Sequence, residues 1–508
     1  MSHSPLHSRL LRTLNAALQE PRSRQALSRR GFLQTLGGAA LVQPAAWSAP
    51  AVSHDVAIVG AGLAGLSCAY ELKKAGVRAP IYEASDRAGG RCHSLAGFFP
   101  GQVAERGGEL IDNLHKTMIG YAREFGLTLE DVGKMPGEVR YHLDGRDVPE
   151  SVIVEEFRAF VPAMRADLRR LSPEPTADSH NEADKQLDYL NLRQYLETRR
   201  AGRLISKAIE EAYVAEYGRE LDDQSCLNLL LFIHADRRSR FTPFGVFSDE
   251  RYHIVEGNDG IARGLANRLP GQIVPCKQLA AVKPASDGRL RLIFSNGSWA
   301  EHGAVVLTCP FSVLRNIDLK DLKLPKWKTD AINGLGYGEN AKLMIGFTRP
   351  QWRDLNCNGS SYSDLADHQA TWETNPTLAN GTRAVLTDYS GGNRGRNYLS
   401  EPLQVKAARF LGDLDRVMPG VHSSARRDKT GSLMVHLEHW PSNAFSRGSY
   451  TCYQPGQFTS IAGNEGKPVG NLYFAGEHTN SFYEWQGFME GALLSGIQAA
   501  ADIVRKKR

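Results

Sequence analysis

The sequence predicts an α/β fold in which strands from distant parts of the chain complete one parallel sheet. Three observations predict it. A short β-branched apolar run at residues 55–59 is followed at once by the glycine-rich stretch 60–65 and a helical pattern. A second apolar run at 78–82 leads into Glu83, and residues 471–474 form a third run before the last helix. The order of strand, glycine turn, helix, strand and acid is typical of a Rossmann-type dinucleotide-binding domain.

The glycine-rich stretch has the residue types that a dinucleotide site requires. Gly60 permits a tight turn, Gly62 lets the backbone approach a pyrophosphate, and Gly65 lets the helix pack against the strand. The helix begins near Leu63 and Ala64, where free N–H groups and a partial positive charge attract phosphate. We therefore expect these five residues at the cofactor.

Two further elements indicate which dinucleotide is bound. Glu83, at the end of the second strand, is placed to accept hydrogen bonds from the adenosine ribose hydroxyls. Gly90 and Arg91 follow, and the planar fork of an arginine binds phosphate oxygens in pairs. Residues 89–91 resemble the GGR element of the flavin amine oxidase superfamily, in which the arginine pairs with the FAD phosphates. The resemblance implies FAD rather than NAD.

The end of the chain resembles the same superfamily. Residues 471–479, followed by the start of the last helix, look like the closing FAD motif of monoamine, polyamine and L-amino-acid oxidases. The resemblance implies that Gly476 and Glu477 lie beside the ribityl-phosphate. It also implies that the helix starting near Phe488 and Met489 directs its positive end at the flavin.

Between its two ends the resemblance covers roughly residues 54–508. Leu279 matches the position whose backbone meets the adenine, and Lys342 matches the active-site lysine that holds a water near flavin N5. Ser449 stands where monoamine oxidases have the cysteine that bonds covalently to the flavin, and Cys452 lies three residues away. We therefore expect FAD to be bound non-covalently.

The resemblance implies oxidation of an amine, by hydride transfer from the carbon that bears nitrogen to flavin N5. For an amino acid the imine product hydrolyses to a 2-oxo acid and ammonia. Tyr450, Phe488 and Trp485 would supply the aromatic faces that orient the amine, and Lys342 would position a water. Apart from the resemblance, core packing is the favoured interpretation of these aromatic residues.

The segment 106–115 bears on the substrate, because it resembles exported bacterial L-amino-acid oxidases or dehydrogenases. Leu110 stands where other amino-acid oxidases have the arginine that binds the substrate carboxylate. A carboxylate partner must then come from elsewhere, and the candidates are Arg106, Arg251 and His253.

Two acids in that segment, Glu109 and Asp112, favour a substrate with a cationic side chain, such as lysine or arginine, although they are equally consistent with helix caps. The leading hypothesis is thus oxidation of an L-amino acid, for which a basic one, lysine or arginine, is a candidate. Polyamine or monoamine oxidation is the alternative, and an FAD-dependent desaturase or a non-catalytic flavin-binding protein are further ones. The electron acceptor is O₂ or a respiratory acceptor, and a homodimer is compatible with the sequence.

The order of the motifs predicts two interleaved domains with the active site between them, a Rossmann-type FAD-binding domain and an α+β substrate-binding domain. The FAD-binding domain is assigned to residues 54–130, 251–310 and 431–508. The substrate-binding domain is assigned to residues 131–250 and 311–430, and its stretch 192–209 has helical spacing.

The first 52 residues predict export. They hold six arginines and one glutamate, which accounts for the whole formal net charge of +5, so charge gives no indication of nucleic-acid binding. Residues 28–34 resemble the twin-arginine export motif, and an apolar stretch too short to span a bilayer follows. No other segment approaches transmembrane length. We expect a signal peptide over 1–52 and a periplasmic or secreted enzyme.

Overall fold

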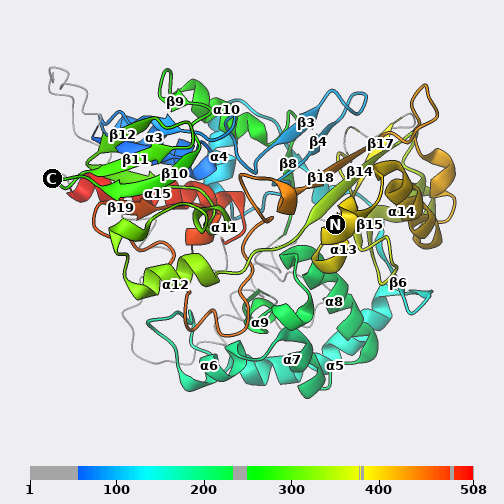
Figure 1. Ribbon diagram of the computed structural model, residues 1–508. Helices are drawn as coiled ribbons and strands as arrows, with labels where there is room; N and C mark the ends of the chain where they lie inside the picture. Colours follow the sequence, from blue (N-terminus) through cyan, green and yellow to red (C-terminus); the bar gives the residue numbers. More distant parts are fainter. Residues whose placement is uncertain (1–54, 233–248, 377, 379–382, 481–485, 507–508) are drawn as a thin grey trace. The chain divides into compact units, whose positions relative to one another are not determined.

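The structure is a computed structural model that describes residues 55–232, 249–376, 378, 383–480 and 486–506. Its dinucleotide-binding half contains a five-stranded parallel sheet in the order β19-β13-β1-β2-β9 (Figure 1). The strands are β1 (Val56–Val59), β2 (Ile81–Tyr82), β9 (Ile273–Val274), β13 (Ala304–Leu307) and β19 (Leu472–Phe474). Every residue of the central strands β1 and β13 and of the edge strand β19 is buried, as expected for a parallel sheet covered on both faces.

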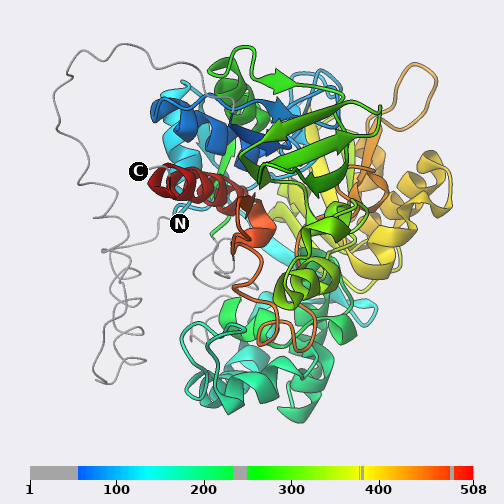
Figure 2. The same cartoon turned by 60° about the vertical axis from the view of Figure 1, so that its left-hand side comes forward.

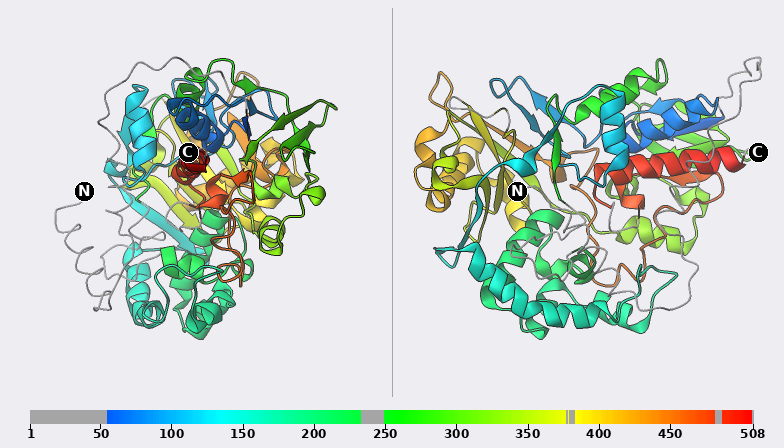
Figure 3. Two further views of the ribbon diagram at one scale, coloured as in Figure 1. Left: turned by 90° about the vertical axis from the view of Figure 1, so that its left-hand side faces the viewer. Right: turned by 180° about the vertical axis from the view of Figure 1, so that it is seen from behind.

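Two helices from opposite ends of the chain cover this sheet together. Helix α3 (Leu63–Lys74) and the last helix, α15 (Met489–Lys506), lie side by side (Figure 2). Close contact is possible because Gly496 has no side chain: a Cβ there would lie 2.1 Å from the carbonyl oxygen of Ala64. Seen from behind, α4 (Lys116–Glu124) lies next to both (Figure 3). Glu490 accepts hydrogen bonds from two backbone N–H groups at the start of α4, which ties the C-terminal helix to it.

The other half contains a seven-stranded mixed sheet in the order β18-β14-β17-β16-β15-β6-β7. These strands are β6 (Glu138–Leu143), β7 (Arg146–Val148), β14 (Ala341–Phe347), β15 (Cys357–Ser363), β16 (Ala370–Glu373), β17 (Ala384–Ser390) and β18 (Val435–His439). Because β18 pairs with β14, the stretch assigned from residue 431 to the FAD-binding domain begins with a strand of this second sheet.

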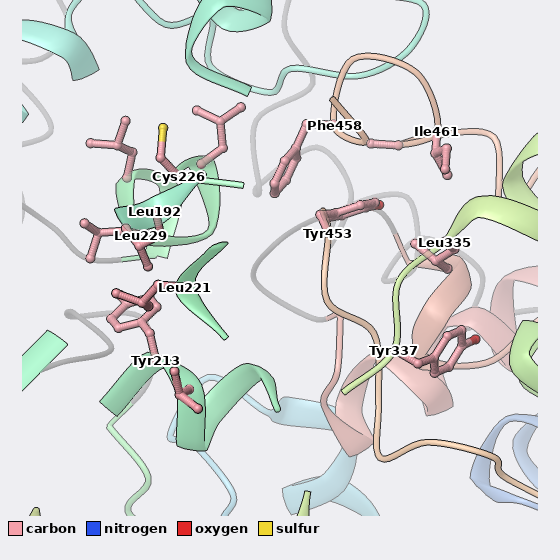
Figure 4. Close-up of a cluster of buried hydrophobic side chains, with 14 of the residues drawn as sticks. Leu192, Tyr213, Leu221, Cys226, Leu229, Leu335, Tyr337, Tyr453, Phe458 and Ile461 are labelled. Atoms are coloured by element: carbon pink, nitrogen blue, oxygen red, sulfur yellow. The ribbon is translucent and has the colours of Figure 1, made fainter. Parts of the chain in front are cut away.

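Helices α5 (Glu150–Leu168) and α8 (Arg203–Tyr217) pack against this sheet. Helices α6 (Glu182–Asp188), α7 (Leu192–Thr198) and α9 (Leu227–Phe232) share a hydrophobic core with them. The stretch 192–209 is two helices rather than one, because the chain turns before Gly202, the N-cap of α8. Their apolar faces share a core with a loop from the C-terminal part of the chain. In that core Tyr453 packs on Phe458, with 4.3 Å between ring centroids (Figure 4).

Smaller elements complete the described chain. The short strands are β3 (Ser94–Ala96), β4 (Val103–Glu105), β5 (Leu129–Asp131), β8 (Tyr252–Ile254), β10 (Leu279–Pro284), β11 (Leu290–Phe294) and β12 (Trp299–His302). The remaining α-helices are α10 (Asp259–Asn267), α11 (Phe311–Leu314), α12 (Lys326–Gly334), α13 (Gly392–Arg396) and α14 (Leu403–Val417). Within the described residues, none of the helices has the length and apolar character needed to cross a membrane.

Candidate active site

A cavity of about 760 Å³ extends from the glycine-rich stretch after β1 to the seven-stranded sheet. Most of the residues expected at the cofactor line it: Gly60, Gly62, Leu63, Ala64, Glu83, Gly90, Arg91, Leu279, Gly476, Glu477, Phe488 and Met489. The same cavity continues past Lys342 and Tyr450. One continuous space therefore joins the predicted dinucleotide site to the predicted substrate site.

Each of the three glycines of the first turn is required for a different steric reason. Gly60 has a φ of +104°, and a Cβ there would lie 2.4 Å from the Oγ1 of Thr308. At Gly65 a Cβ would lie 1.9 Å from the carbonyl oxygen of Gly60, so the helix could not approach the strand. At Gly62 the nearest atom would be the Cα of Gly90, 4.0 Å away. The missing side chain of Gly62 therefore leaves space in the cavity rather than relieving contact within the protein.

Glu83 lies at the end of β2, where it is held by its neighbours. Its Oε2 accepts a hydrogen bond from the backbone N–H of Ala61 at 2.6 Å. Its Oε1 accepts from the N–H and the hydroxyl of Ser85, both at 2.8 Å. These bonds fix the carboxylate beside the glycine turn, at the position expected for a ribose partner.

Arg91 links the first half of the dinucleotide site to the last. Its guanidinium donates to the carbonyl of Ser449 and, at 2.9 Å, to Oε1 of Glu477. The other oxygen of Glu477 accepts from the hydroxyl of Thr451 and from the N–H of Gly487. The positive charge is thereby placed at the cavity by contacts that join segments almost 400 residues apart in sequence.

These features fit FAD. Helix α3 begins with no side-chain cap at its N-terminus, so its first N–H groups are oriented for phosphate oxygens. Gly62 leaves room for a pyrophosphate to reach them, and Arg91 adds a cation. Ser449 lines the cavity where a covalent cysteine would stand, and its hydroxyl bonds to Asn340. Cys452 is buried and is not among the described lining residues.

Lys342, from β14, is buried at the boundary between the two ends of the cavity. Its ammonium donates to Oε2 of Glu109 at 2.6 Å, to the carbonyl of Gly107 at 2.7 Å and to that of Glu105 at 3.3 Å. The other oxygen of Glu109 accepts from the indole N–H of Trp372 at 2.8 Å. Glu109, which the sequence indicated as a substrate ligand, lines the cavity but has both oxygens bound within the protein.

Four aromatic side chains, Trp372, Tyr389, Tyr450 and Phe488, line the substrate end and are called the aromatic wall below. The rings of Trp372 and Tyr389 meet edge to face at 5.5 Å, and the hydroxyl of Tyr389 donates to that of Tyr450 at 3.0 Å. Sequence reasoning found Tyr450 and Phe488 but missed the other two, because they belong to no motif and only the pairing of β16 with β17 brings them here. Trp485 lies outside the described residues.

Two carboxylates of the substrate end, Glu216 and Glu250, are called the acidic pair below. Burial, then the charge of Asp112, raises the pKa of Glu216 to about 7. Burial, then the charges of Glu216 and Asp112, raises the pKa of Glu250 well above its ordinary value. Within the described residues no cation pairs with either carboxylate. No motif or spacing in the sequence indicated either residue.

The other predicted substrate ligands lie elsewhere, and their assignment is corrected. His253 is fully buried between Glu105 and Glu130, whose hydrogen bonds outweigh burial and raise the pKa of His253 to about 9. Arg251 forms an ion pair with Asp131 at 2.8 Å. His253 lies in β8 of the β5–β8 pair, Arg251 directly precedes that strand, and neither lines the described cavity.

Arg106 and Asp112 likewise have partners within the protein. Arg106 pairs with Glu438 of β18 at 2.5 Å. Asp112 accepts from the N–H of Glu250 and lies 3.3 Å from the ring of His115. Asp112 therefore holds the backbone of Glu250 in place, and it is not among the described residues that line the cavity.

The family described as flavin containing amine oxidoreductase matches residues 63–504, and the chain belongs to it. The chain is 24% identical over 464 residues to the lysine-specific histone demethylase 1 homolog 2 of Oryza sativa subsp. japonica, and covers 89% of its own length but 57% of that protein's. It is 23% identical over 465 residues to the L-amino-acid oxidase of Demansia vestigiata, and the match covers 89% of this chain and 86% of that protein. The solved structure of a putrescine oxidase bound to putrescine superposes with a TM-score of 0.76 at 20% identity, over 90% of this chain and 100% of that one.

Family membership and the cavity together define the class of enzyme. The protein has the α/β fold of the FAD-dependent amine oxidases, and FAD is its cofactor. It is an FAD-dependent amine or amino-acid oxidase whose substrate is a small-molecule amine. Among the residues that the structure describes, no group of histidine, cysteine and carboxylate side chains could hold a metal ion.

Proposed function

We propose that this enzyme oxidises an amine that carries a second cationic group, and that its substrates are the basic L-amino acids lysine and arginine. The observation that carries the proposal is the acidic pair, Glu216 and Glu250, at the substrate end of the cavity. Two carboxylates that repel each other, and that have no cationic partner among the described residues, are stabilised by a cation placed between them. A lysine or arginine side chain has that charge at the end of an apolar stem.

The backbone holds the acidic pair at the cavity. Glu250 has a φ of +43°, a left-handed conformation that costs a residue with a side chain about 1 kcal/mol. Its N–H donates to Asp112 at 2.8 Å, which helps to maintain that conformation. On the other side, the carbonyl of Glu216 accepts from the hydroxyl of Tyr450, which connects the acidic pair to the aromatic wall. Strain kept at a cavity supports a role for Glu250 in function.

The aromatic wall provides the second part of the site. Bound FAD supplies a hydride acceptor for the carbon that bears the amine. Tyr450 and Phe488 offer flat apolar faces along which the stem of the substrate can lie, while they restrict water at the reacting carbon. We propose that the α-carbon is oxidised and that the imine is hydrolysed to a 2-oxo acid and ammonia. The resemblance to an L-amino-acid oxidase supports this choice.

A second candidate is a diamine or polyamine, and one observation favours it. A substrate α-carboxylate requires a cation, and among the described residues Lys342 is the cation beside the aromatic wall, where Glu109 already neutralises it. The other described cations of the lining are Arg87, Arg91, Lys277 and Arg447, from segments at the dinucleotide end. The likeness to a putrescine oxidase fits this alternative.

Anaerobic bleaching of the flavin near 450 nm separates these candidates. The panel contains L-lysine, L-arginine, L-leucine, D-lysine, putrescine, spermidine and tyramine. Bleaching by L-lysine and L-arginine in preference to L-leucine is the expected result. Bleaching by putrescine and spermidine alone would replace the amino acid with a diamine, and equal bleaching by L-leucine would remove the acidic pair from substrate recognition.

The sequence supports three further proposals about the whole protein. Residues 1–52 act as a twin-arginine signal peptide and direct the enzyme to the periplasm or the medium; retention of full-length protein in the cytoplasm would refute this. FAD is bound non-covalently, so acid precipitation should leave the flavin in the supernatant. Oxygen or a respiratory acceptor reoxidises the flavin, which oxygen consumption measured against dye reduction will distinguish.

A further inference from the structure

The ion pair of Lys342 and Glu109 forms a closed arrangement at the centre of the cavity lining. An ammonium has three donors, and the part of the chain that the structure describes gives Lys342 three acceptors: the Glu109 carboxylate and the carbonyls of Gly107 and Glu105. The two carbonyls belong to the backbone and cannot neutralise charge. Glu109 is therefore the residue that balances the lysine.

Glu109 also determines where an aromatic side chain lies. One oxygen binds the Lys342 ammonium at 2.6 Å and the other accepts from the indole of Trp372 at 2.8 Å. Because the two partners come from β14 and β16, the carboxylate bridges two strands that are separated by β17 in the sheet. The Lys342 ammonium lies 5.6 Å from the centroid of the Trp372 ring and 5.7 Å from that of Tyr389.

We propose that Glu109 is a positioning residue for the amine oxidation, acting through Lys342 and Trp372. Its carboxylate holds the ammonium in one place at the cavity and fixes the indole plane of the aromatic wall. The geometry turns Glu109 toward its two partners within the protein rather than toward a substrate cation, because each of its oxygens already has a donor and its side chain is 3% exposed. The proposal holds for any amine that the cavity accepts.

Loss of the Glu109 charge has two consequences. In E109Q the side-chain amide has one oxygen, which accepts, and one NH2 group, which donates. The NH2 group must face either the Lys342 ammonium or the indole N–H of Trp372, both of which are donors, so one of the two contacts is lost. Lys342 is then left buried with backbone carbonyls alone, which is unfavourable for an ammonium. The lysine and the aromatic wall lose their fixed geometry, and small displacements of positioning groups reduce reaction rates by large factors.

The test is a double-mutant cycle on the FAD-loaded enzyme, with E109Q, K342M and E109Q/K342M. The rate of flavin reduction at saturating substrate is measured with the amine that bleaches best. We expect E109Q to reduce this rate about tenfold or more, with a much smaller change in the substrate Kd. Without the ammonium, the amide oxygen of E109Q is free to accept from the indole N–H of Trp372, so the double variant should be no slower than K342M. If E109Q reduces the rate of the K342M variant as much as it reduces that of the wild type, the proposal is overturned.

A readout that needs no turnover accompanies the rate. Lys342 is acetylated with acetic anhydride, and the labelled fraction of its peptide is measured by mass spectrometry. E109Q should label Lys342 several times faster than the wild type, because the amine has lost its ion-pair partner. If no amine bleaches the flavin, the proposed function fails while this measurement still decides the role of Glu109. Unchanged labelling in E109Q contradicts the ion pair.

Two variants guard against a general loss of structure. D167N removes the charge of another buried carboxylate, which pairs with Arg199 at 2.9 Å and is not part of the described cavity lining; it should keep the wild-type rate and labelling. E109D retains the charge and should lose less rate than E109Q. An E109D rate equal to that of E109Q, or an equal loss in D167N, would show that the Glu109 charge is not what positions Lys342.

Discussion

The acidic pair predicts how substrate binding depends on pH. The pKa of Glu216 is raised to about 7 by burial and by Asp112, whereas attraction of a cation requires the ionised carboxylate. The affinity for a cationic substrate is therefore present above pH 7 and lost as the pH falls through it. With that pKa, about a tenth of Glu216 is ionised at pH 6 and about nine-tenths at pH 8. The apparent affinity should rise about tenfold between these values.

The assay is anaerobic stopped-flow reduction of the flavin, which gives the substrate Kd at pH 6, 7 and 8. L-Leucine serves as the uncharged comparison, because its own α-amine titrates like that of L-lysine. E216Q/E250Q removes both titrating carboxylates of the acidic pair, so in that variant the ratio of the L-lysine Kd to the L-leucine Kd should become independent of pH, and in E216Q alone it should change much less than tenfold. The same tenfold change in E216Q, or an equal change for L-leucine in the wild type, would refute the assignment.

The remaining predictions concern stability and cofactor retention. Because the pKa of Glu216 is higher in the folded protein than when unfolded, its contribution to stability is lost as the pH rises through about 7, and E216Q should raise the free energy of unfolding at pH 8 by about 2 to 3 kcal/mol in urea titrations. The pKa of His253 is also raised, to about 9, so its ion pairs stabilise the fold below pH 6.5 and this stability is lost through pH 9; H253Q should flatten that loss in thermal melts, and a parallel curve would contradict it. G62A should fold normally but release FAD during gel filtration, whereas G65A should be destabilised even without cofactor, because only the second Cβ collides with the protein. Normal FAD content in G62A would place the pyrophosphate elsewhere.

Much of the dinucleotide site could be predicted from the sequence, because its requirements are local. The turn from β1 to α3 needs glycine at Gly60 for its positive φ and at Gly65 for the close approach to the carbonyl of Gly60, so their spacing records the geometry. Helix α15 and Glu477 were recognised by resemblance to a family motif. What this reasoning could not supply is that Arg91 and Glu477 contact each other, since nothing local to either residue encodes that pairing.

The substrate end shows the opposite case. The sequence around Glu109 is the same whether this residue caps a helix, binds a substrate or pairs with Lys342. Only the placing of β14 and β16 in one sheet decides among these roles. Glu216 and Glu250 stand on α8 and just before β8, and no periodicity marks either of them. The sequence by itself determined the cofactor half, because glycine sterics act between neighbouring residues. The tertiary structure alone decided which charges face the amine, because a buried charge depends on partners that the fold brings from hundreds of residues away.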